Sequence, residues 1–376
     1  MRAPDADALA RATLALCAIP SPTGAEAALA DYVADWAARV WPAEERVRVG
    51  HSFVLGRRED PRPTVALVGH LDTVPAHADT GVPRREGDRL VGTGASDMKG
   101  GVAVMMALAE SLPRERLGVN LLLVLYEREE GPYAESGLGP LFHRVPELSG
   151  ARFAVALEPT DGVVQVGCVG SLHATVRFRG KSAHAARPWQ GVNALHLAGP
   201  LLSELLALPP REVDCGGYGF REVFTATLGE AGRARNVVPD LFTLNVNVRF
   251  APGRTAADAE ADLRQLVAGR ADVEVTDRSP SAPVCTSNPF FHALLRASGK
   301  PAAAKQAWTD VARLAQHGVE AVNFGPGDTA QAHQAGESVS VRALGAAYQA
   351  LAAVLGSGQD RPGGAPSTHP PGRVRT

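Results

Sequence analysis

Histidine and carboxylate side chains follow several apolar stretches of this 376-residue sequence, at the point where each stretch ends. "VALVG" is followed by His70 and Asp72, "LLLVLY" runs into Glu129 and Glu130, and "FAVAL" is followed by Glu158. Short, nearly continuous apolar runs are typical of strands in a parallel sheet, and the carboxyl ends of such strands form the ligand crevice of open α/β folds. We therefore expect these side chains to meet at one edge of one sheet.

Two further residues extend this set. Asp97 lies in "GTGASDMKGG", just before a helix pattern opened by glycines, and His333 follows "VNFGPGD" in a loop. Taken singly, each residue has an ordinary structural interpretation: His70 is a loop histidine, Asp97 the N-cap of the next helix, and Glu158 a turn carboxylate. Their shared position favours a joint role, because independent surface residues need not fall at the same end of a sheet.

Charge repulsion sharpens this interpretation. Several carboxylates in one crevice would repel one another, which raises the pKa of some of them and destabilises the fold unless a cation neutralises them. Two histidines with several carboxylates suit zinc or a similar divalent transition ion better than calcium, which prefers oxygen ligands throughout. One carboxylate bridging two ions about 3.5 to 4 Å apart would make a two-metal hydrolytic site.

The hydrophobic pattern predicts the elements that would position these residues. Apolar residues recur at helical spacing in some segments and form short continuous runs in others. The predicted elements are helices at residues 6–17 and 25–40, and strands at residues 64–69, 121–126, 153–158 and 319–325. Strands that alternate with helices predict an α/β fold, with a mostly parallel sheet flanked by helices.

The middle of the chain follows another pattern. Strands such as "LHATVRFRG" and "LFTLNVNVRF" alternate apolar with polar residues, as antiparallel strands with one solvated face do. Helical patterns at residues 193–206 and 256–268 could cover the other face. This segment is therefore expected to form an α+β insertion.

These patterns divide the chain into domains. We expect a catalytic domain made of residues 1–170 and 282–356, interrupted by an inserted domain at residues 171–281. Residues 357–376 are rich in Pro, Gly and Ser without apolar periodicity, so a disordered tail without a catalytic role is expected there.

Composition excludes several classes of function. The formal net charge is -2 and no run of Lys or Arg stands out, which argues against a nucleic-acid partner. No apolar run is long enough to span a bilayer and the amino terminus lacks the layout of a signal peptide, so no membrane partner and a cytoplasmic location are expected. The four cysteines lack C-x-x-C spacing and predict neither a zinc ribbon nor a disulfide framework.

A series of ordered segments resembles the M20 family of metallopeptidases and amidohydrolases. They are "GHLDTVP", "GASDMKGG", "REEG", "LEPT", "GKSAHAARPWQGVNA", "RARNVVPD", "NVRF" and "AHQAGE", and they cover almost the whole chain except the tail. The resemblance implies a zinc exopeptidase-like catalytic domain, with an inserted lid domain that makes a homodimer. It also implies two Zn²⁺ ions per subunit, with Co²⁺ as a possible substitute.

The resemblance assigns the metal ligands by matching position. His70, Asp97 and Glu158 would hold one ion, while Asp97, Glu130 and His333 would hold the other. Asp97 would then bridge the two ions.

Three further residues match catalytic positions of the family. Asp72 would orient the imidazole of a metal-bound histidine and raise its basicity. Glu129 would act as the general base, taking a proton from the attacking water and handing it to the leaving amine. His184, in "SAHAARP", would reach into the active site of the partner subunit and stabilise the tetrahedral oxyanion, a contribution commonly worth about 3 kcal/mol.

Substrate contacts are implied for several residues. Asn236 in "RNVVP" and Arg249 in "NVRF" match positions that contact the acyl and carboxylate groups of the substrate, although both could be polar residues at a strand edge. Ser171, in the "GS" pair, belongs to the same implied set.

One departure from the family pattern concerns the acyl group. Desuccinylases of the better-known type carry an arginine just before "GS", but Cys168 and Val169 stand there in this chain. A succinyl carboxylate would then be recognised by Arg249 or Arg187, with Thr309 as a hydrogen-bonding helper, because a guanidinium suits a carboxylate bidentately. If neither arginine faces the pocket, an acetyl or other neutral acyl group is favoured.

Within the family, "ALEPTDGVVQVG", "AWTDVARLA" and "NFGPGD" are most similar to members that hydrolyse N-succinyl-LL-2,6-diaminopimelate in lysine biosynthesis. The expected function is therefore the removal of succinate from this small N-acyl amino acid. The alternatives within the family are N-acetylornithine deacetylase, N-acyl amino acid hydrolase and dipeptidase. A binding protein that has lost catalysis is disfavoured, because all the implied ligands and Glu129 are present.

Overall fold

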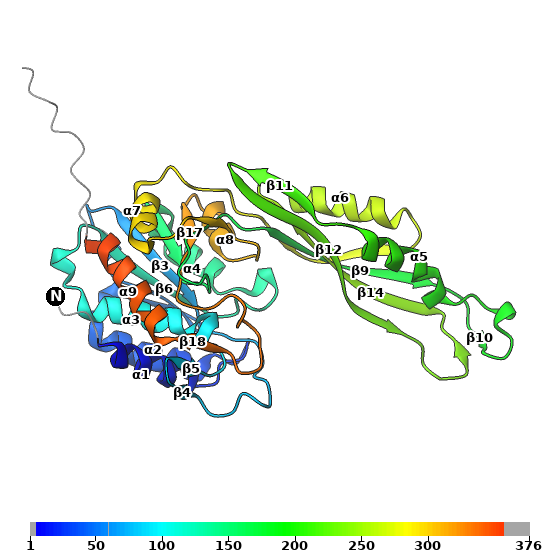
Figure 1. Cartoon of the computed structure of the whole chain (residues 1–376), viewed down its shortest axis with the longest axis horizontal. Coiled ribbons are helices and arrows are strands. Elements are labelled where there is room, and N and C mark those ends of the chain that lie inside the picture. Colours follow the sequence, from blue (N-terminus) through cyan, green and yellow to red (C-terminus); the bar gives the residue numbers. More distant parts are fainter. Residues whose placement is uncertain (1–4, 59, 357–376) are drawn as a thin grey trace, which may run out of the picture.

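The computed structural model describes residues 5–58 and 60–356. Its larger part is a mixed eight-stranded sheet with helices on both faces, and its smaller part is a five-stranded antiparallel sheet that carries two helices (Figure 1). The fold is thus α/β with an α+β insertion, as the sequence predicts. The predicted tail at residues 357–376 lies outside the described residues.

The eight-stranded sheet has the order β1-β2-β6-β3-β7-β17-β8-β16. Its strands are β1 (Arg46–Val49), β2 (Ser52–Leu55), β3 (Thr64–His70), β6 (Asn120–Tyr126), β7 (Phe153–Ala156), β8 (Gln165–Val166), β16 (Ala303–Ala304) and β17 (Ala321–Asn323). The central strands β6, β3, β7 and β17 run parallel, so their carboxyl ends share one edge of the sheet. These four are the strands that the apolar runs predict, although β7 and β17 end earlier than expected.

Helices bury both faces of this sheet. The first face is covered by α1 (Ala6–Cys17), α2 (Ala27–Val40), α3 (Gly100–Ser111), α7 (Pro289–Ser298) and α9 (Val341–Gly356), and the second by α4 (Leu138–Arg144) and α8 (Val311–Gln316). Side chains alternate between the two cores: Val65 and Leu67 of β3 face the first, whereas Ala66 and Val68 face the second. Burial on both sides explains why the strands are apolar throughout.

Short elements connect these layers. They are the helical turns η1 (Ala43–Glu45), η2 (Ala95–Lys99), η3 (Arg114–Arg116), η4 (Tyr133–Glu135), η5 (Pro146–Gly150) and η6 (Pro188–Gln190), and the strands β4 (Arg84–Glu86), β5 (Arg89–Val91) and β18 (Ser338–Ser340) of a small sheet. Within the described residues, no helix is both long and apolar enough to cross a membrane.

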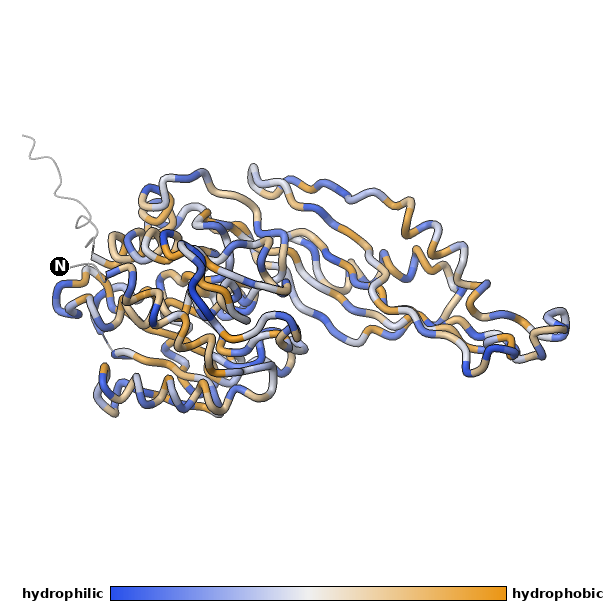
Figure 2. The backbone as a smooth tube through the Cα atoms, turned by 60° about the horizontal axis from the view of Figure 1, so that its bottom comes forward, coloured by the Kyte–Doolittle hydropathy of each residue, from blue (hydrophilic) through white to orange (hydrophobic). Residues whose placement is uncertain are grey.

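The inserted sheet has the order β11-β12-β14-β9-β15. Its elements are β9 (Gly170–Arg179), β11 (Arg211–Cys215), β12 (Tyr218–Ala231), β14 (Leu241–Phe250), β15 (Asp272–Ser279), α5 (Ala194–Ala207) and α6 (Ala256–Val267). The two helices cover one face, where Leu172 and Val176 pack against Leu201 and Leu263. Hydrophobic and hydrophilic residues therefore alternate along these strands (Figure 2). The short pair β10 (Ala183–His184) and β13 (Val237–Val238) lies at the far end of the insertion (Figure 1).

Candidate metal centre and substrate cleft

His70 is the last residue of β3, and its ring is almost wholly buried. Its Nδ1 donates to the backbone oxygen of Asp72 at 2.9 Å and lies 3.5 Å from Oδ1 of the same residue. Since a carbonyl oxygen can only accept, Nδ1 carries a proton and Nε2 is the nitrogen left to bind a ligand. Nε2 lies 3.2 Å from Oδ1 of Asp97. Asp72 thus orients the ring toward Asp97.

Asp72 also fixes the segment that follows β6. Its Oδ1 accepts a hydrogen bond from the backbone N–H of Glu129 at 2.9 Å, and its Oδ2 accepts from that of Glu130 at 3.0 Å. The chain leaves strand geometry after Tyr126, and Arg128 adopts a φ of 60°. This turn lets two adjacent glutamates face the same site, which a regular strand would forbid.

Asp97 is held by a residue near the carboxyl end of the described chain. The carboxylate of Glu337 accepts the backbone N–H groups of Gly94 at 2.7 Å and of Ser96 and Asp97 at 2.8 Å. Asp97 has a φ of -122° and does not cap α3, whose N-cap residue is Lys99. The N-cap interpretation is therefore wrong, and the Asp97 side chain faces the cluster instead.

The remaining members of the cluster, His333 and Glu158, come from two loops. Nε2 of His333 lies 2.8 Å from Oε1 of Glu130 and 3.6 Å from Oδ2 of Asp97, and half of the His333 side chain is exposed. Glu158, which follows β7, is buried, and its Oε1 has no hydrogen-bond partner among the described residues. A buried carboxylate oxygen without a donor is costly unless a cation supplies the missing interaction.

These side chains form sets in which one nitrogen or oxygen atom of each residue lies within 4.8 Å of the others. The sets are His70 with Asp97 and Glu158, Asp97 with Glu130 and His333, and His70 with Glu129 and Glu130. Asp97 belongs to the first two sets, so it lies between them. Two imidazoles, several carboxylates and an orphaned buried oxygen fit divalent transition ions.

The pKa values of the cluster residues also favour bound cations. Burial, followed by the charges of Glu158 and Glu130, raises the pKa of Glu129 well above its usual range. Burial and the charge of Asp97 raise the pKa of Glu158 to about 7, and the hydrogen bond to Glu130 raises the pKa of His333 to about 9. The buried carboxylates repel one another, and bound cations would relieve this repulsion.

A cleft of about 330 Å³ connects the cluster to the inserted sheet. From the eight-stranded part it is lined by the cluster residues other than His70 and by Tyr133, Lys305, Trp308 and Thr309. From the inserted part it is lined by Ser171, His173, Arg249, Asp277 and Ser279. Three of the predicted substrate-contacting residues, Ser171, Arg249 and Thr309, therefore line the cleft. The wall from the inserted sheet is polar, whereas its opposite face packs on α5 and α6.

The other predicted residues lie elsewhere in the same chain. His184 belongs to β10, the backbone N–H of Ala185 donates to the Asn236 carbonyl at 2.8 Å, and that of Arg187 donates to the His184 carbonyl at 2.8 Å. His184, Asn236 and Arg187 thus lie together at the far end of the insertion, away from the cleft (Figure 1). Within one chain, Arg249 is the one of the two candidate arginines that reaches the pocket.

Some residues of the site carry no signal in the sequence that would single them out. Lys305 is buried, and its Nζ donates to the Pro159 carbonyl at 3.0 Å, beside Glu158. Glu337 lies within "AHQAGE", but its role depends on contacts with a distant segment. Alternation predicts only a solvated face for His173, and it places Asp277 on the opposite face, because the sequence does not reveal the register shift in β15.

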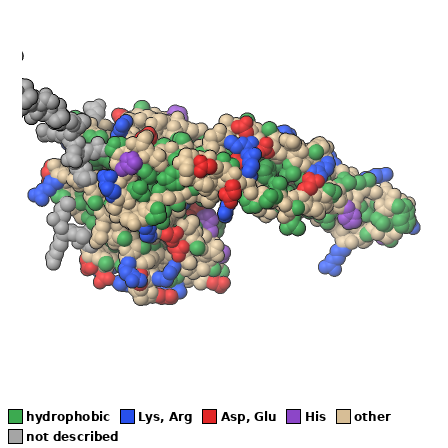
Figure 3. All heavy atoms as spheres, turned by 45° about the horizontal axis from the view of Figure 1, so that its top comes forward, with side chains coloured by type: hydrophobic (Ala, Val, Ile, Leu, Met, Phe, Trp, Pro, Cys, Tyr) green, Lys and Arg blue, Asp and Glu red, His purple; other side chains and the backbone are tan. Residues whose placement is uncertain are grey.

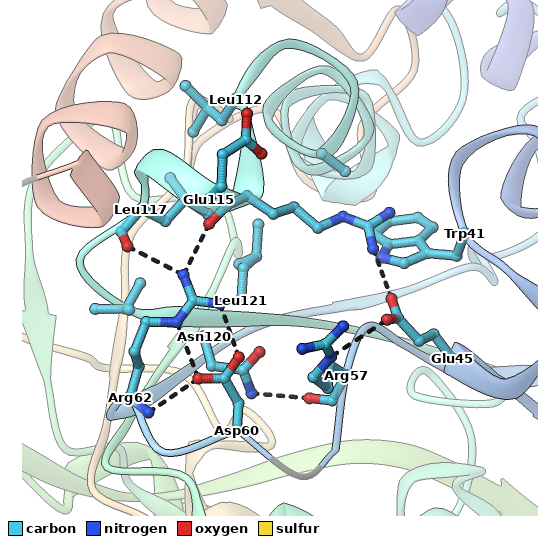
Figure 4. Close-up of a pocket in the computed structure, with 13 residues that line it drawn as sticks. Trp41, Glu45, Arg57, Asp60, Arg62, Leu112, Glu115, Leu117, Asn120 and Leu121 are labelled. Atoms are coloured by element: carbon cyan, nitrogen blue, oxygen red, sulfur yellow. Dashed lines mark hydrogen bonds and ion pairs between the residues drawn. The ribbon is translucent and has the colours of Figure 1, made fainter.

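A second cavity, of about 270 Å³, lies at the amino end of β6 (Figure 4). Its charged side chains pair with one another: Arg62 donates to both oxygens of Asp60 at 2.9 and 2.7 Å, and Arg114 pairs with Glu45 at 2.6 Å. Arg62 also donates to the carbonyl of Leu117 at 3.1 Å. Since these donors are already used, the charged residues of this second cavity hold surface segments together and offer few free donors to a ligand.

Sequence comparisons find similar proteins over most of the chain. A Mycobacterium tuberculosis protein with the provisional name succinyl-diaminopimelate desuccinylase DapE is 39% identical over 345 residues, covering 92% of this chain and 97% of that protein. A succinyl-diaminopimelate desuccinylase of Corynebacterium glutamicum is 35% identical over 339 residues, covering 88% of this chain and 92% of that protein.

A solved structure shares the fold of this chain, and a family profile gives its classification. The M20 family metallo-carboxypeptidase Sso-CP2 of Sulfolobus solfataricus superposes with a TM-score of 0.74 at 15% identity, covering 93% of this chain and 98% of that one. At this identity the likeness concerns the fold alone. Residues 66–357, most of the chain, match the profile of the peptidase family M20/M25/M40. The chain therefore belongs to the peptidase family M20/M25/M40.

Proposed function

We propose that this chain is a zinc-dependent hydrolase that splits N-succinyl-LL-2,6-diaminopimelate into succinate and LL-2,6-diaminopimelate, a step of lysine biosynthesis. The observation that carries the proposal is a pair of ligand sets that share Asp97, with Glu129 beside them and Arg249 in the same cleft. The desuccinylase names of the two relatives support this reaction.

In this proposal the two ligand sets hold two ions. His70, Asp97 and Glu158 hold one Zn²⁺, and Asp97, Glu130 and His333 hold the other, with Co²⁺ as a substitute. Bound there, the ions would act as Lewis acids toward the amide carbonyl and would lower the pKa of a water molecule. Hydrogen bonds to the Asp72 carbonyl and to the Glu337 carboxylate orient His70 and the backbone of Asp97, as partners of metal ligands commonly do.

Glu129 is the proposed general base. One of its carboxylate oxygens lies within 4.8 Å of ligand atoms of His70 and Glu130, and its backbone is anchored to Asp72. From there it would accept a proton from the attacking water and deliver it to the amide nitrogen as the bond to the carbonyl carbon breaks. Its burial favours this exchange, because a buried carboxylate binds a proton more readily than an exposed one.

Arg249 is the proposed partner of the succinyl carboxylate. Its Nε donates to Oδ1 of Asn247 at 2.9 Å, and among the described residues no carboxylate pairs with its guanidinium. A half-buried guanidinium without an acidic partner, beside Ser171 and Thr309, suits an acid at the end of the acyl group. An acetyl group carries no carboxylate, so in an acetylornithine deacetylase Arg249 could pair only with the carboxylate of the amino acid. The desuccinylase names of the two relatives favour the succinyl substrate.

A homodimer formed through the inserted domain completes the proposed site. His184, Asn236 and Arg187 lie too far along the insertion to serve the cleft of their own chain, so a second copy would receive them. Apolar side chains gather on this end of the molecule (Figure 3). Trp189 is 76% exposed and Leu206 is 90% exposed, and a second copy would bury such surface.

We further propose the domain division and the compartment that the sequence indicates. Residues 171–281 form the inserted domain between two parts of the catalytic domain, residues 1–170 and 282–356. Free Cys17 and Cys168, both buried, suit a reducing cytoplasm.

A substrate comparison tests the proposed function. One preparation, loaded with zinc, is offered N-succinyl-LL-2,6-diaminopimelate, N-acetylornithine and a dipeptide at equal concentrations. The proposal predicts the highest kcat/KM for the succinyl substrate, because only that substrate gives Arg249 a carboxylate on the acyl group. A higher kcat/KM for either of the others would contradict the desuccinylase assignment.

A further inference from the structure

The inserted sheet presents a polar wall to the cleft. Strands β14, β9 and β15 lie side by side, and in register they align Arg249 with Ser171 and Asn247 with His173. On the other side of β9, Asp277 aligns with His173, and Ser279 with Ser171. We call these six residues the polar wall: Ser171, His173, Asn247, Arg249, Asp277 and Ser279. The function proposed above uses Arg249 and Ser171, but gives Asp277 no role.

A β-bulge places Asp277 on the polar wall. Pairing between β15 and β9 is regular up to Val275, and the next pair is Asp277 with His173, so Thr276 is an extra residue. Without the bulge, strand alternation would put Thr276 and Arg278 on the wall and would turn Asp277 toward the helices. The bulge thus puts Asp277 where Thr276 would face His173, and Ser279 where Arg278 would face Ser171. Bulges next to active sites commonly redirect side chains in this way.

Asp277 has no cationic partner in the part of the chain that the structure describes. Its Oδ2 accepts a hydrogen bond from Ser279 Oγ at 3.4 Å, and no Lys, Arg or His side chain pairs with it. The other charged residues of β15 are paired: Asp272 with Arg179 at 2.8 Å, Arg278 with Glu260 at 2.7 Å, and Glu274 with Arg177. The one unpaired charge of this strand is therefore the one that lines the cleft.

We propose that Asp277 binds a free ammonium group of the substrate, so that the enzyme selects N-acyl diamino acids over N-acyl monoamino acids. This inference rests on the proposed function. The cleft already contains several carboxylates, and its cations Arg249 and Lys305 donate to Asn247 and to the Pro159 carbonyl and not to Asp277. A cationic group of the ligand would therefore stabilise the charge of Asp277. An ammonium group would donate a charge-assisted hydrogen bond to Asp277, while Arg249 takes a carboxylate.

The proposed substrate carries the group that Asp277 requires. N-succinyl-LL-2,6-diaminopimelate has a second amine at the end of the chain that is remote from the scissile amide. N-succinyl-L-2-aminopimelate has the same chain length and both carboxylates of the amino-acid part, but lacks that amine. These two substrates therefore differ only in the group assigned to Asp277.

The test compares kcat/KM for the two substrates with the full-length, zinc-loaded protein. Loss of the amine is expected to lower kcat/KM roughly 10- to 100-fold, as is usual for the loss of a hydrogen bond between charged groups. In the isosteric variant Asp277→Asn, the ratio of the two values should fall to within about threefold. The matched control Asp272→Asn lies on the same strand and face but outside the cleft, and should keep the wild-type ratio.

The outcomes separate this inference from the proposed function. Equal kcat/KM for both substrates with the wild-type protein would overturn the role of Asp277 and leave the desuccinylase assignment in place. An unchanged ratio in Asp277→Asn would overturn it too. Failure to hydrolyse either substrate would count against the proposed function itself. The wild-type comparison needs no variant, so a folding defect of Asp277→Asn would not prevent the test.

Discussion

Glu127 and Glu129, which follow β6 and are separated by Arg128, have different roles. Glu129 belongs to the buried cluster, whereas Oε1 of Glu127 accepts the backbone N–H of His51 at 2.9 Å on the other side of the chain. Strand alternation would have grouped Glu127 with Glu129. The positive φ of Arg128 and the two hydrogen bonds to Asp72 pair Glu129 with Glu130 instead.

Replacement of Glu129 by Gln tests its role as the base. The variant should lower kcat by about 10²- to 10⁴-fold, because an amide cannot accept the proton, while the zinc content stays unchanged. Turnover and bound metal are measured on the same preparation. Glu127→Gln is the matched control and should keep kcat near the wild-type value. Full turnover by Glu129→Gln would remove Glu129 as the base.

At the scale of elements, the parallel strands β3, β6 and β7 position three of the proposed metal ligands. The core residues of β3 and β6 alternate between two helical layers, so both strands are buried throughout. His70, Glu130 and Glu158 lie at or just after the ends of these strands, where any shift of the sheet would move them, whereas Asp97 and His333 come from loop segments. Stability of the sheet and geometry of the site are therefore linked through the same residues.

A core substitution tests how much the burial of β6 stabilises the sheet. Leu123, in the middle of β6, is fully buried, and Leu123→Ala should lower the free energy of unfolding by about 2 to 5 kcal/mol. Denaturant unfolding of the metal-free protein gives this value. Val82→Ala, at a position 79% exposed, should change it by less than about 0.5 kcal/mol. A near-zero effect of Leu123→Ala would contradict the burial described for β6.

Helices and strands could be predicted where their burial requires a recognisable pattern of hydrophobic residues. Strands β3 and β6 and helix α1 follow from apolar runs and helical spacing, because both faces of a strand or one face of a helix must be hydrophobic. The roles of Glu337 and Lys305 were not predictable, since they depend on contacts between segments far apart in the chain. Asp277 was hidden by the bulge, because alternation alone assigns it to the opposite face.

At the scale of the whole molecule, the proposed dimer would give a role to His184, which lies far from the cleft of its own chain (Figure 1). The inserted domain extends away from the cleft, and His184 lies at its far end (Figure 1). If His184 serves the cleft of a second copy, each active site takes Glu129 from one subunit and His184 from the other. Such sharing makes a prediction that no single-chain site would make.

Mixing two inactive variants tests this arrangement. His184→Ala and Glu129→Gln should each be nearly inactive alone. After subunit exchange at equal amounts, half of the dimers are hybrids with one intact site, so activity should recover to roughly a quarter of the wild-type value. Sedimentation should show that both variants remain dimers. If activity does not recover although hybrids form, or if His184→Ala is fully active alone, His184 does not act across the interface.

The most direct test of the central claim is succinate release from N-succinyl-LL-2,6-diaminopimelate before and after removal of metal. The two ligand sets around Asp97 predict that zinc-loaded protein releases succinate, that exhaustive chelation abolishes the release, and that about two zinc ions per chain restore it. Release at an unchanged rate by the chelated protein, or no release by the zinc-loaded protein, would contradict the account.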